Sequence, residues 1–283
     1  MPALPHRILT CPVCSEYLQQ DGRTLACARG HRFDTARQGY VNLLTGRGSP
    51  FEGDSAEMVD AREDFLGSGH YLPLRDAVVE AVLRRSPPAA VALDAGAGTG
   101  YYLEGLARAL PGVFPIALDV SKVALRRAAR RLPEGISIVW DVWRPLPLAD
   151  GTVDIVLNVF APRNPAEFVR VLAPGGCVVV VTPRPGHLAG LHAVGPLLSV
   201  PAQKADDVLA SFEGSLVEAD RVELDYSMSL PYGLARSALV MGPAARHADA
   251  DGGGGGGGRP GTEESVVLDV AARFTVQVLA RRS

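Results

Sequence analysis

The chain has 283 residues, of which 47% are hydrophobic and 21% charged, and its formal net charge is −3. These values are typical of a folded globular protein and exclude a disordered chain or one that is basic over its whole surface. Apolar runs such as Cys177–Val181 are far shorter than the ~20 residues of a membrane-spanning helix. Residues 1–10 lack the apolar stretch of a secretory signal, so we expect a cytoplasmic protein with no membrane partner.

A cluster of potential metal ligands comes first in the chain. Cys11, Cys14, Cys27 and His31 form the pattern C-x2-C-x12-C-x3-H and include three of the four cysteines. Thiolate and imidazole ligands at this spacing are typical of tetrahedral zinc. The alternatives are a disulfide pair or unrelated core residues, although cytosolic proteins rarely keep disulfides. Because four protein ligands leave no position open, we expect structural zinc in a small module over residues 1–45.

The rest of the chain shows alternating helix and strand patterns. Over residues 46–85, apolar positions at helical spacing on both sides of Gly67-Ser68-Gly69 predict a connection of two helices. In residues 86–283, strands are predicted at Val91–Asp94, Ile116–Asp119, Ile136–Trp140, Val153–Asn158 and Cys177–Thr182. Helices are predicted at Tyr101–Leu110, Ser121–Arg131 and Ala166–Leu172. The alternation predicts an α/β domain, with a mostly parallel sheet and helices on both faces.

Two further strands are expected near the C-terminus, at Leu216–Leu230 and Ala271–Arg281, where apolar and polar residues alternate. Between them, Gly252–Gly258 is an unbroken glycine run, which loses much backbone entropy on ordering. We therefore expect a flexible loop over about residues 249–261. Cys177 lies in an apolar run and is interpreted as a core residue rather than a nucleophile.

A glycine-rich turn follows the first predicted strand of the main domain. Asp94 ends that strand, and Gly96, Gly98 and Gly100 occupy the turn that opens the next helix. Glycines there let the backbone approach a ligand closely. The dinucleotide-binding pattern needs a small residue at position 101, where this chain has Tyr101, so a nicotinamide cofactor is disfavoured. A turn without a ligand is the alternative.

The pattern D-x-G-x-G-x-G resembles the first motif of class I methyltransferases, which surrounds the methionine part of S-adenosylmethionine. By that resemblance, Asp119 after the second strand accepts hydrogen bonds from both ribose hydroxyls, and Asp141 after the third lies near the adenine. Three such elements at the carboxyl ends of successive strands are stronger evidence than a glycine turn alone, because open α/β sheets bind ligands there. The expected fold is thus the Rossmann-like methyltransferase fold with a zinc module.

A wider set of residues resembles the RlmA family of 23S ribosomal RNA guanine-N1 methyltransferases. They are the zinc ligands, Phe33-Asp34, Gly39–Leu44, Gly53–Met58, Gly69-His70-Tyr71, Leu118–Lys122, Ala161-Pro162, Pro174-Gly175-Gly176, Thr182-Pro183 and His187-Leu188. The resemblance covers about residues 11–245. It implies methylation of N1 of a guanine in hairpin 35 of 23S rRNA, a zinc module that helps to grip the RNA, and a homodimer.

The resemblance also places Tyr71, Gly100, Tyr101 and His187 at the cofactor. Without it, the two tyrosines would be interpreted as packing residues and His187 as a loop residue. The segment Asn158–Asn164 follows the fourth strand, where such enzymes usually hold the target base. It resembles the branch of the family in macrolide-producing actinomycetes, which confers resistance to tylosin-like drugs. The chain departs from the family at its glycine run and at Ala245, where relatives often have tryptophan, so substrate affinity or dimer packing can differ.

Two groups of basic residues are candidates for RNA contact. In the zinc module, arginines outnumber acids, and they are Arg23, Arg29, Arg32, Arg37 and Arg47. Two aromatic residues, Phe33 and Tyr40, lie among them and are expected to pack around the metal. Arginines there suit phosphate contact, so we expect this module to bind RNA. The second group is interpreted as the solvated face of a helix and comprises Lys122, Arg126, Arg127, Arg130 and Arg131.

Guanine N1 carries a proton that must leave before or during methylation, which calls for a base or for stabilisation of charge on O6. The segment Asn158–Asn164 contains no carboxylate. Asp119, Asp141 and His187 are expected to be occupied by the cofactor, so no catalytic residue is assigned. Two other functions stay open: a small-molecule methyltransferase with an enclosed apolar pocket, and an inactive zinc-bearing RNA-binding protein.

Overall fold

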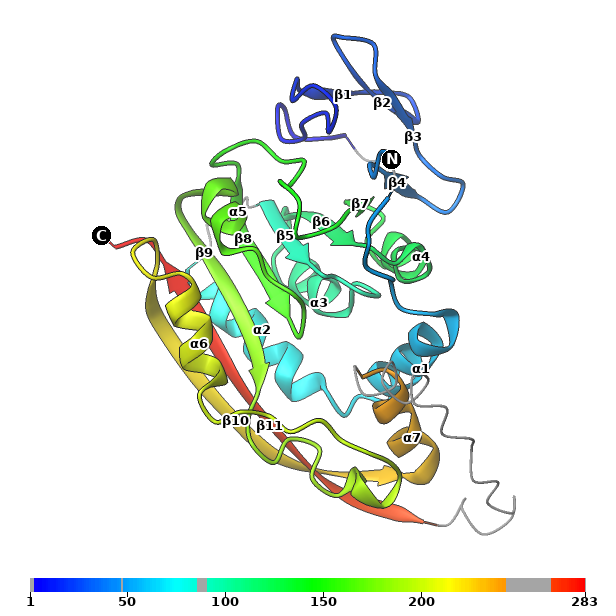
Figure 1. Ribbon diagram of the computed structural model, residues 1–283, viewed down its shortest axis with the longest axis vertical. Coiled ribbons are helices and arrows are strands. Elements are labelled where there is room, and N and C mark those ends of the chain that lie inside the picture. The colour runs from blue at the N-terminus through cyan, green and yellow to red at the C-terminus, as the bar shows by residue number, and fades with distance from the viewer. Residues whose placement is uncertain (1–2, 47, 86–90, 243–265, 283) are drawn as a thin grey trace.

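The computed structural model describes residues 3–46, 48–85, 91–242 and 266–282 (Figure 1). The glycine run Gly252–Gly258, Ala245 and Arg47 lie outside these residues. Near the N-terminus, a small antiparallel sheet has the order β1-β2-β3. Its strands are β1 (Leu18–Asp21), β2 (Thr24–Cys27) and β3 (Arg32–Asp34). Within the described ranges, no helix has the length and apolar character needed to span a membrane.

The large sheet has eight strands in the order β10-β11-β9-β8-β5-β6-β7-β4. They are β4 (Tyr40–Asn42), β5 (Val91–Ala95), β6 (Phe114–Asp119), β7 (Ile136–Val139), β8 (Val153–Val159), β9 (Leu172–Pro183), β10 (Val217–Pro231) and β11 (Val267–Ala280). The strands from β9 to β4 pair in parallel, whereas β11 runs antiparallel to β9 and β10. The predicted mostly parallel sheet is confirmed.

Strand β11 begins at Val267, four residues before the predicted Ala271, and two other strands differ from the prediction. Strand β9 begins at Leu172, because the chain passes from helix to extended backbone there rather than at Cys177. Strand β4 pairs in parallel with β7, so a segment that the sequence places in the zinc module adds an edge strand to the large sheet. Three residues are too few for a recognisable alternation of apolar and polar positions. The sequence pattern therefore carries no signal for this pairing.

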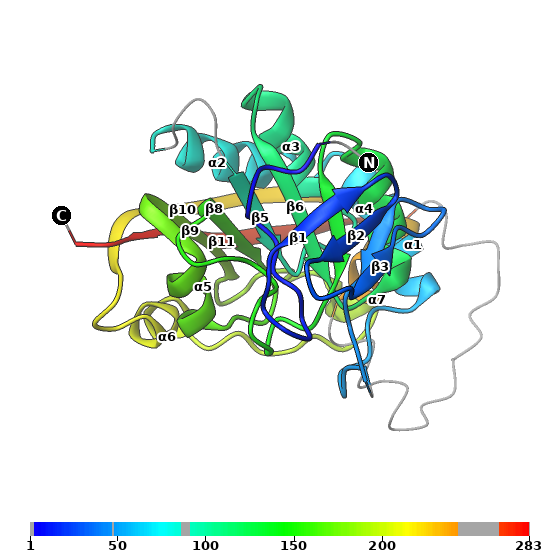
Figure 2. The same ribbon diagram turned by 90° about the horizontal axis from the view of Figure 1, so that it is seen from above.

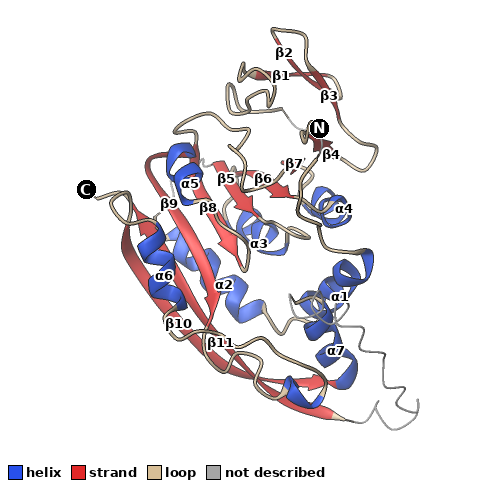
Figure 3. Ribbon diagram, in the orientation of Figure 1, coloured by secondary structure: helices blue, strands red, loops and turns tan. Residues whose placement is uncertain are grey.

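Helices cover both faces of the large sheet (Figures 2 and 3). They are α1 (Ala56–Gly67), α2 (Leu72–Leu83), α3 (Tyr101–Ala109), α4 (Lys122–Arg131), α5 (Pro165–Val171), α6 (Lys204–Ser211), α7 (Tyr232–Val240) and the short 3-10 helix η1 (Leu191–Ala193). Figure 2 shows α2 and α3 on one side of the sheet and α5 and α6 on the other. The two helices predicted on either side of Gly67-Ser68-Gly69 are α1 and α2, and Gly69 has the left-handed φ of +86°.

Side chains of the central strands alternate between two cores. In β8, Ile155 and Leu157 pack with α2, α3 and α4, whereas Val156 packs with α5, α6 and the N-terminal segment. This period of two is what a strand buried on both faces requires. The chain leaves β5 toward β6 on one side and later returns to β8 on the other, and ligands bind at such a switch point in open α/β sheets. A ligand site is therefore expected at the carboxyl ends of β5 and β8.

Candidate active site and zinc centre

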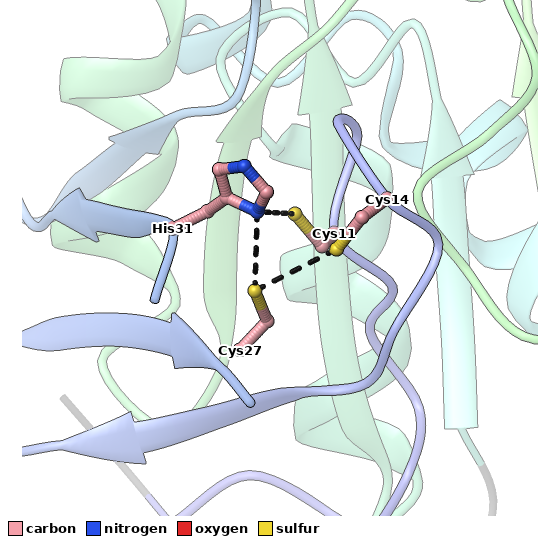
Figure 4. A group of neighbouring side chains, drawn as sticks. All are labelled: Cys11, Cys14, Cys27 and His31. Carbon is pink, nitrogen blue, oxygen red and sulfur yellow. Dashed lines mark hydrogen bonds between the residues drawn. The ribbon is translucent and has the colours of Figure 1, made fainter. Parts of the chain in front are cut away.

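The four predicted zinc ligands lie together (Figure 4), with ligand atoms all within 4.8 Å of one another. Sγ of Cys27 lies 3.3 Å from Nδ1 of His31, and Sγ of Cys14 lies 3.7 Å from Sγ of Cys27. The second distance is too long for a disulfide bond of about 2.05 Å. It matches the edge of about 3.8 Å that Zn–S bonds of about 2.3 Å give in a tetrahedron. The donor set therefore fits structural zinc and does not fit a disulfide.

The local backbone supports the metal centre. Burial raises the pKa of the Cys27 thiol, but hydrogen bonds from His31 and Arg29 outweigh it and lower the pKa to about 6. A readily formed thiolate is the species that binds zinc. The neighbouring segment is held to the main domain, since the Thr10 N–H donates to the Pro147 carbonyl at 3.0 Å. The metal centre is thus part of one packed unit with the large sheet.

A cavity of about 690 Å³ opens at the carboxyl ends of β5 and β8. Most of the predicted cofactor residues line it: Tyr71, Asp94, Gly96, Gly98, Tyr101, Asp119, Asp141 and His187. Gly100 does not line it. This residue precedes α3 with φ of +79°, and a Cβ there would lie 3.2 Å from the backbone of Ala128 in α4. Gly100 is therefore needed for the helix start and its packing.

The glycine turn packs closely against the loop after β8. A Cβ on Gly96 would lie 2.3 Å from the Cβ of Ala161, so the loop after β8 rests directly on this turn. Gly98 has a φ of +52°, and its N–H donates to Asp119 Oδ2 at 2.8 Å. Asp119 Oδ1 accepts the Ser121 N–H at 2.8 Å. A carboxylate offers about four lone-pair sites, so each oxygen can still accept a hydroxyl.

Asp94 is a buried carboxyl group without a complete set of partners. Within the described residues, its Oδ1 has no hydrogen-bond partner. Burial, and to a smaller extent the charge of Asp119, raise the pKa of Asp94 to about 8. Leaving a buried acceptor unpaired costs about 1–3 kcal/mol. A ligand that brings a positively charged donor would remove this cost, and the amino group of S-adenosylmethionine is such a donor.

Tyr71 and His187 meet at the wall of the cavity. The His187 ring also contacts Phe160 in a stacked arrangement, with centroids 6.4 Å apart and planes at 19°. Burial lowers the pKa of His187 to about 4, so its ring is neutral at physiological pH. Asp141 also lines the cavity, and its Oδ2 accepts the Ser49 hydroxyl at 2.9 Å. The sequence-predicted residues are therefore brought together from separate elements around one space.

Exposed apolar side chains surround the cavity, which sequence reasoning did not identify. They are Phe51, Trp143, Phe160 and Leu198, with exposed fractions of 53%, 51%, 44% and 51%. Phe160 also has a left-handed φ of 53°, which is rare for an aromatic residue. Strained residues often cluster at functional sites. The only signal in the sequence was the position of Phe160 in the segment expected to hold a target base.

Several of the basic residues predicted to face solvent are engaged in ion pairs. On α4, Arg131 pairs with Glu63 of α1 and Glu104 of α3, and Arg127 pairs with Asp60 of α1. These two arginines therefore join helices, while the remaining cations are exposed: Lys122, Arg126 and Arg130.

In the zinc module, Arg29 lies 3.7 Å from Glu16 and Arg32 lies 2.9 Å from Asp21. Both pairs are exposed at the surface, where ion pairs are weak, so phosphate groups can compete for these arginines. The guanidinium of Arg23 donates to the Ala36 carbonyl at 3.0 Å. Tyr40 is buried in the core of the large sheet rather than packed around the metal centre. Phe33 packs against the core that contains the zinc ligands.

Comparisons with known proteins bear on both parts of the chain. The description of the N-terminal zinc ribbon of RlmA matches residues 9–46, and that of a methyltransferase domain matches residues 92–176. A candidate 23S rRNA (guanine-N1)-methyltransferase of Micromonospora griseorubida is 45% identical over 87% of this chain and 88% of the relative. The chain belongs to the RlmA family of methyltransferases. As a member of the RlmA family it uses S-adenosylmethionine, and its Cys3His cluster holds structural zinc.

Other relatives of this RlmA-family protein agree. The 23S rRNA (guanine(748)-N(1))-methyltransferase of Streptomyces fradiae is 40% identical, with 87% of this chain and 88% of the relative covered. Among solved structures, the [4+2]-cyclase SpnF is similar with a TM-score of 0.51 and 17% identity, covering 83% of this chain and 98% of that one. This likeness supports the Rossmann-like fold alone, since a cyclase and a methyltransferase share it.

Proposed function

We propose that this chain transfers a methyl group from S-adenosylmethionine to N1 of a guanine in hairpin 35 of 23S rRNA. The observation that carries the proposal is a cavity lined on one side by the methyltransferase motifs and open at an aromatic rim. The Streptomyces fradiae relative is named for guanine 748, so guanine 748 is the proposed nucleotide. The proposed location is the cytoplasm, where the ribosomal RNA substrate is available.

On the cofactor side, the chain's own acids are proposed to hold the ligand. Asp119 accepts from the ribose hydroxyls, Asp94 accepts from the methionine amino group, and Asp141 lies beside the adenine. Tyr71 and His187 complete the wall near the methionine part, and Tyr101 begins the helix that follows the glycine turn. When bound, S-adenosylmethionine supplies a methyl group on positively charged sulfur. The protein contributes positioning, which supplies most of the rate enhancement when no covalent intermediate is needed.

On the acceptor side, the aromatic rim is proposed to receive the target base. Sequence-specific RNA recognition commonly uses unstacked bases that stack on aromatic side chains. Phe160 is exposed, lines the cavity and follows β8, so its ring is available for such stacking. Among the described residues, the rim of the cavity carries exposed aromatic side chains. These rings favour a nucleotide base within a larger RNA over a small-molecule acceptor.

The zinc module lies at the end of the molecule opposite α7 (Figure 1). The cavity is lined by residues from Leu239 in α7 to Trp143 in the loop after β7, so an RNA that spans this lining and the module can contact both regions. A folded hairpin holds its phosphates at fixed distances from the target base, whereas a short single strand must be ordered on binding. We propose that the exposed arginines of the module bind phosphates distant from the target base.

Primer extension on modified RNA tests the proposal directly. Purified full-length protein, S-adenosylmethionine and a 23S rRNA fragment that retains hairpin 35 are expected to give a new stop one nucleotide before the methylated guanine. The same fragment with adenine at that position is the control and should give no stop. No new stop on the guanine fragment, or a modification at N2 or N7, would overturn the assignment.

Two further measurements separate the remaining functions. Activity on RNA should fall steeply with rising salt, because phosphate contacts release counterions, whereas a small-molecule methyltransferase would show weak salt dependence. An inactive RNA-binding protein would fail to bind S-adenosylmethionine in calorimetry.

We also propose the division of the chain into three parts, residues 1–45, 46–85 and 86–283. A homodimer and macrolide resistance are proposed from the family resemblance, to be tested by sedimentation and by drug susceptibility of expressing cells.

A further inference from the structure

Two cations line the cavity without a carboxylate partner among the described residues. Arg163 lies in the loop after β8, and Lys204 begins α6. Both side chains are partly buried, and neither forms an ion pair in the described part of the chain. Arg62, by contrast, also lines the cavity but pairs with Asp54. A partly buried cation without a partner is costly, so an anionic group from a ligand is the natural counterpart.

The loop that carries Arg163 is fixed against the cofactor turn. Asn158 is fully buried, and its Nδ2 donates to the Ala95 carbonyl at 3.0 Å and to the Pro162 carbonyl at 2.9 Å. Its Oδ1 accepts from Nε of Arg163 at 3.3 Å. Because this hydrogen bond uses only Nε, the two terminal nitrogens of the guanidinium stay available. Ala161 in the same loop touches the glycine turn, and Arg163 lines the same cavity as Phe160 and Gly96.

Arg163 and Lys204 bring two positive charges to the same part of the cavity lining. Lys204 on α6 lies close enough to Arg163 that burial, together with the charge of Arg163, lowers the pKa of Lys204. Glu167 on α5 is already paired with Arg170 at 2.6 Å. In the loop after β7, Asp141 accepts from the Ser49 hydroxyl and the Trp143 N–H. The other acids of the lining are Glu52, Asp54, Asp94 and Asp119, and Asp54 and Asp119 have donors of their own.

This positive site matches the chemical difficulty of the proposed reaction. Removal of the N1 proton gives guanine a negative charge that is shared between N1 and O6. A fixed cation at O6 favours the anion and thus lowers the pKa of N1, without any carboxylate acting as a base. Arginine is suited to this role, since its planar guanidinium commonly binds guanine O6. The absence of a carboxylate in Asn158–Asn164 is then consistent with catalysis.

We propose that Arg163 binds O6 of the target guanine, with Lys204 beside it, and stabilises the N1-deprotonated base. The inference rests on the proposed function. In the step, the N1–H bond breaks and its proton leaves to solvent water. The electron pair on N1 then forms the N–CH3 bond, and the pair of the broken S–CH3 bond stays on sulfur. Arg163 is thus a catalytic residue that acts by charge and does not itself transfer a proton.

Single-turnover rates measured against pH test this role. With the hairpin 35 fragment, the wild-type rate should rise with pH and level off at high pH. The midpoint of this rise is the pKa of the bound guanine N1. R163M should be about tenfold slower at neutral pH, and its midpoint should move up by about one unit, which corresponds to about 1.4 kcal/mol. K204M should move the midpoint in the same direction by less, and R126M, at an exposed arginine on α4, should leave it unchanged.

A substrate with a more acidic N1 gives a second readout. Replacing the target guanosine with 6-thioguanosine makes N1–H easier to remove, so R163M should recover part of its lost rate. If wild-type protein makes no N1-methylguanine, the proposed function fails. The inference alone is wrong if wild-type protein is active and two results hold. R163M and K204M keep the wild-type midpoint of the rate against pH, and R163M recovers no rate with 6-thioguanosine. Cofactor affinity by calorimetry confirms that each variant is folded, and R163Q, which also removes the charge, replaces R163M if that variant is not.

Discussion

Nε2 of His187 lies 3.2 Å from the phenol oxygen of Tyr71, and the imidazole is the donor in this pair. Nδ1 of His187 accepts the backbone N–H of Arg273 at 3.2 Å and must therefore be unprotonated. In a neutral ring the proton then resides on Nε2 and is donated to the Tyr71 oxygen. The Tyr71 hydroxyl hydrogen remains free, so Tyr71 can donate it to an acceptor in the cavity.

The neutral state of His187 should make stability pH-dependent. Its pKa in the folded protein is about 4, below the ordinary value of about 6.5, so the unfolded chain binds the proton more readily. The resulting contribution to stability is complete above about pH 6.5 and is lost as pH falls toward 4. We expect the melting temperature of wild-type protein to fall relative to H187Q over that range. Parallel melting curves of the two proteins against pH would contradict this assignment.

Asp94 should couple cofactor binding to proton release. Without ligand its pKa is about 8, so it is mostly protonated at neutral pH, whereas an ammonium group in the site would favour the carboxylate. Affinity for S-adenosylmethionine should therefore rise as pH increases from about 6 to 8. Calorimetry in two buffers of different ionisation enthalpy should detect the released proton. D94N should bind more weakly and lose this pH dependence, while D207N, at an exposed position on α6, should retain it.

The glycine turn should tolerate no side chain at the cofactor. G98V is expected to weaken binding of S-adenosylmethionine, because valine strains a backbone with φ of +52° and occupies space in the cavity. G67A is a matched control, since a Cβ there meets no atom within 4 Å. Normal cofactor affinity in G98V would mean that the cofactor lies elsewhere.

Asp119 is expected to contribute hydrogen bonds to the ribose. D119A and D119N should each lower cofactor affinity, by about 10- to 100-fold for loss of charged hydrogen bonds. D119N preserves the size of the side chain and can still accept one of the two backbone N–H groups. If D119N binds as wild type does, the ribose is held by another residue.

Removal of zinc should loosen the N-terminal segment without emptying the cofactor site. C11A and H31A each remove one ligand, and chelation of the metal should have the same effect. We expect lower zinc content, faster proteolysis within residues 1–45 and weaker RNA binding, with cofactor affinity kept. C177A changes the one cysteine outside the cluster and should retain full zinc content. Unchanged zinc and RNA affinity in C11A would contradict a structural role.

Much of the fold could be predicted because its signals are local. The cysteine spacing and the buried strands such as Val153–Asn158 are short-range patterns. The structure brings the four predicted ligands together and has a strand over Val153–Asn158. The lack of a carboxylate partner for Arg163 among the described residues and the exposure of Phe160 could not be predicted, because both depend on which acids and rings other elements bring near. The hydrogen bond between Tyr71 and His187 joins residues 116 positions apart and is likewise a product of the tertiary fold.

The pairing of β4 with β7 has a practical consequence for dissecting this enzyme. Without β4, the backbone of β7 would become an open edge of a large sheet, and open edges promote association between chains. A protein that begins after residue 45 should therefore tend to aggregate, even if its catalytic residues are intact. Loss of activity in such a truncation would combine an unprotected sheet edge with lost RNA contacts, so the zinc module must be probed by single substitutions.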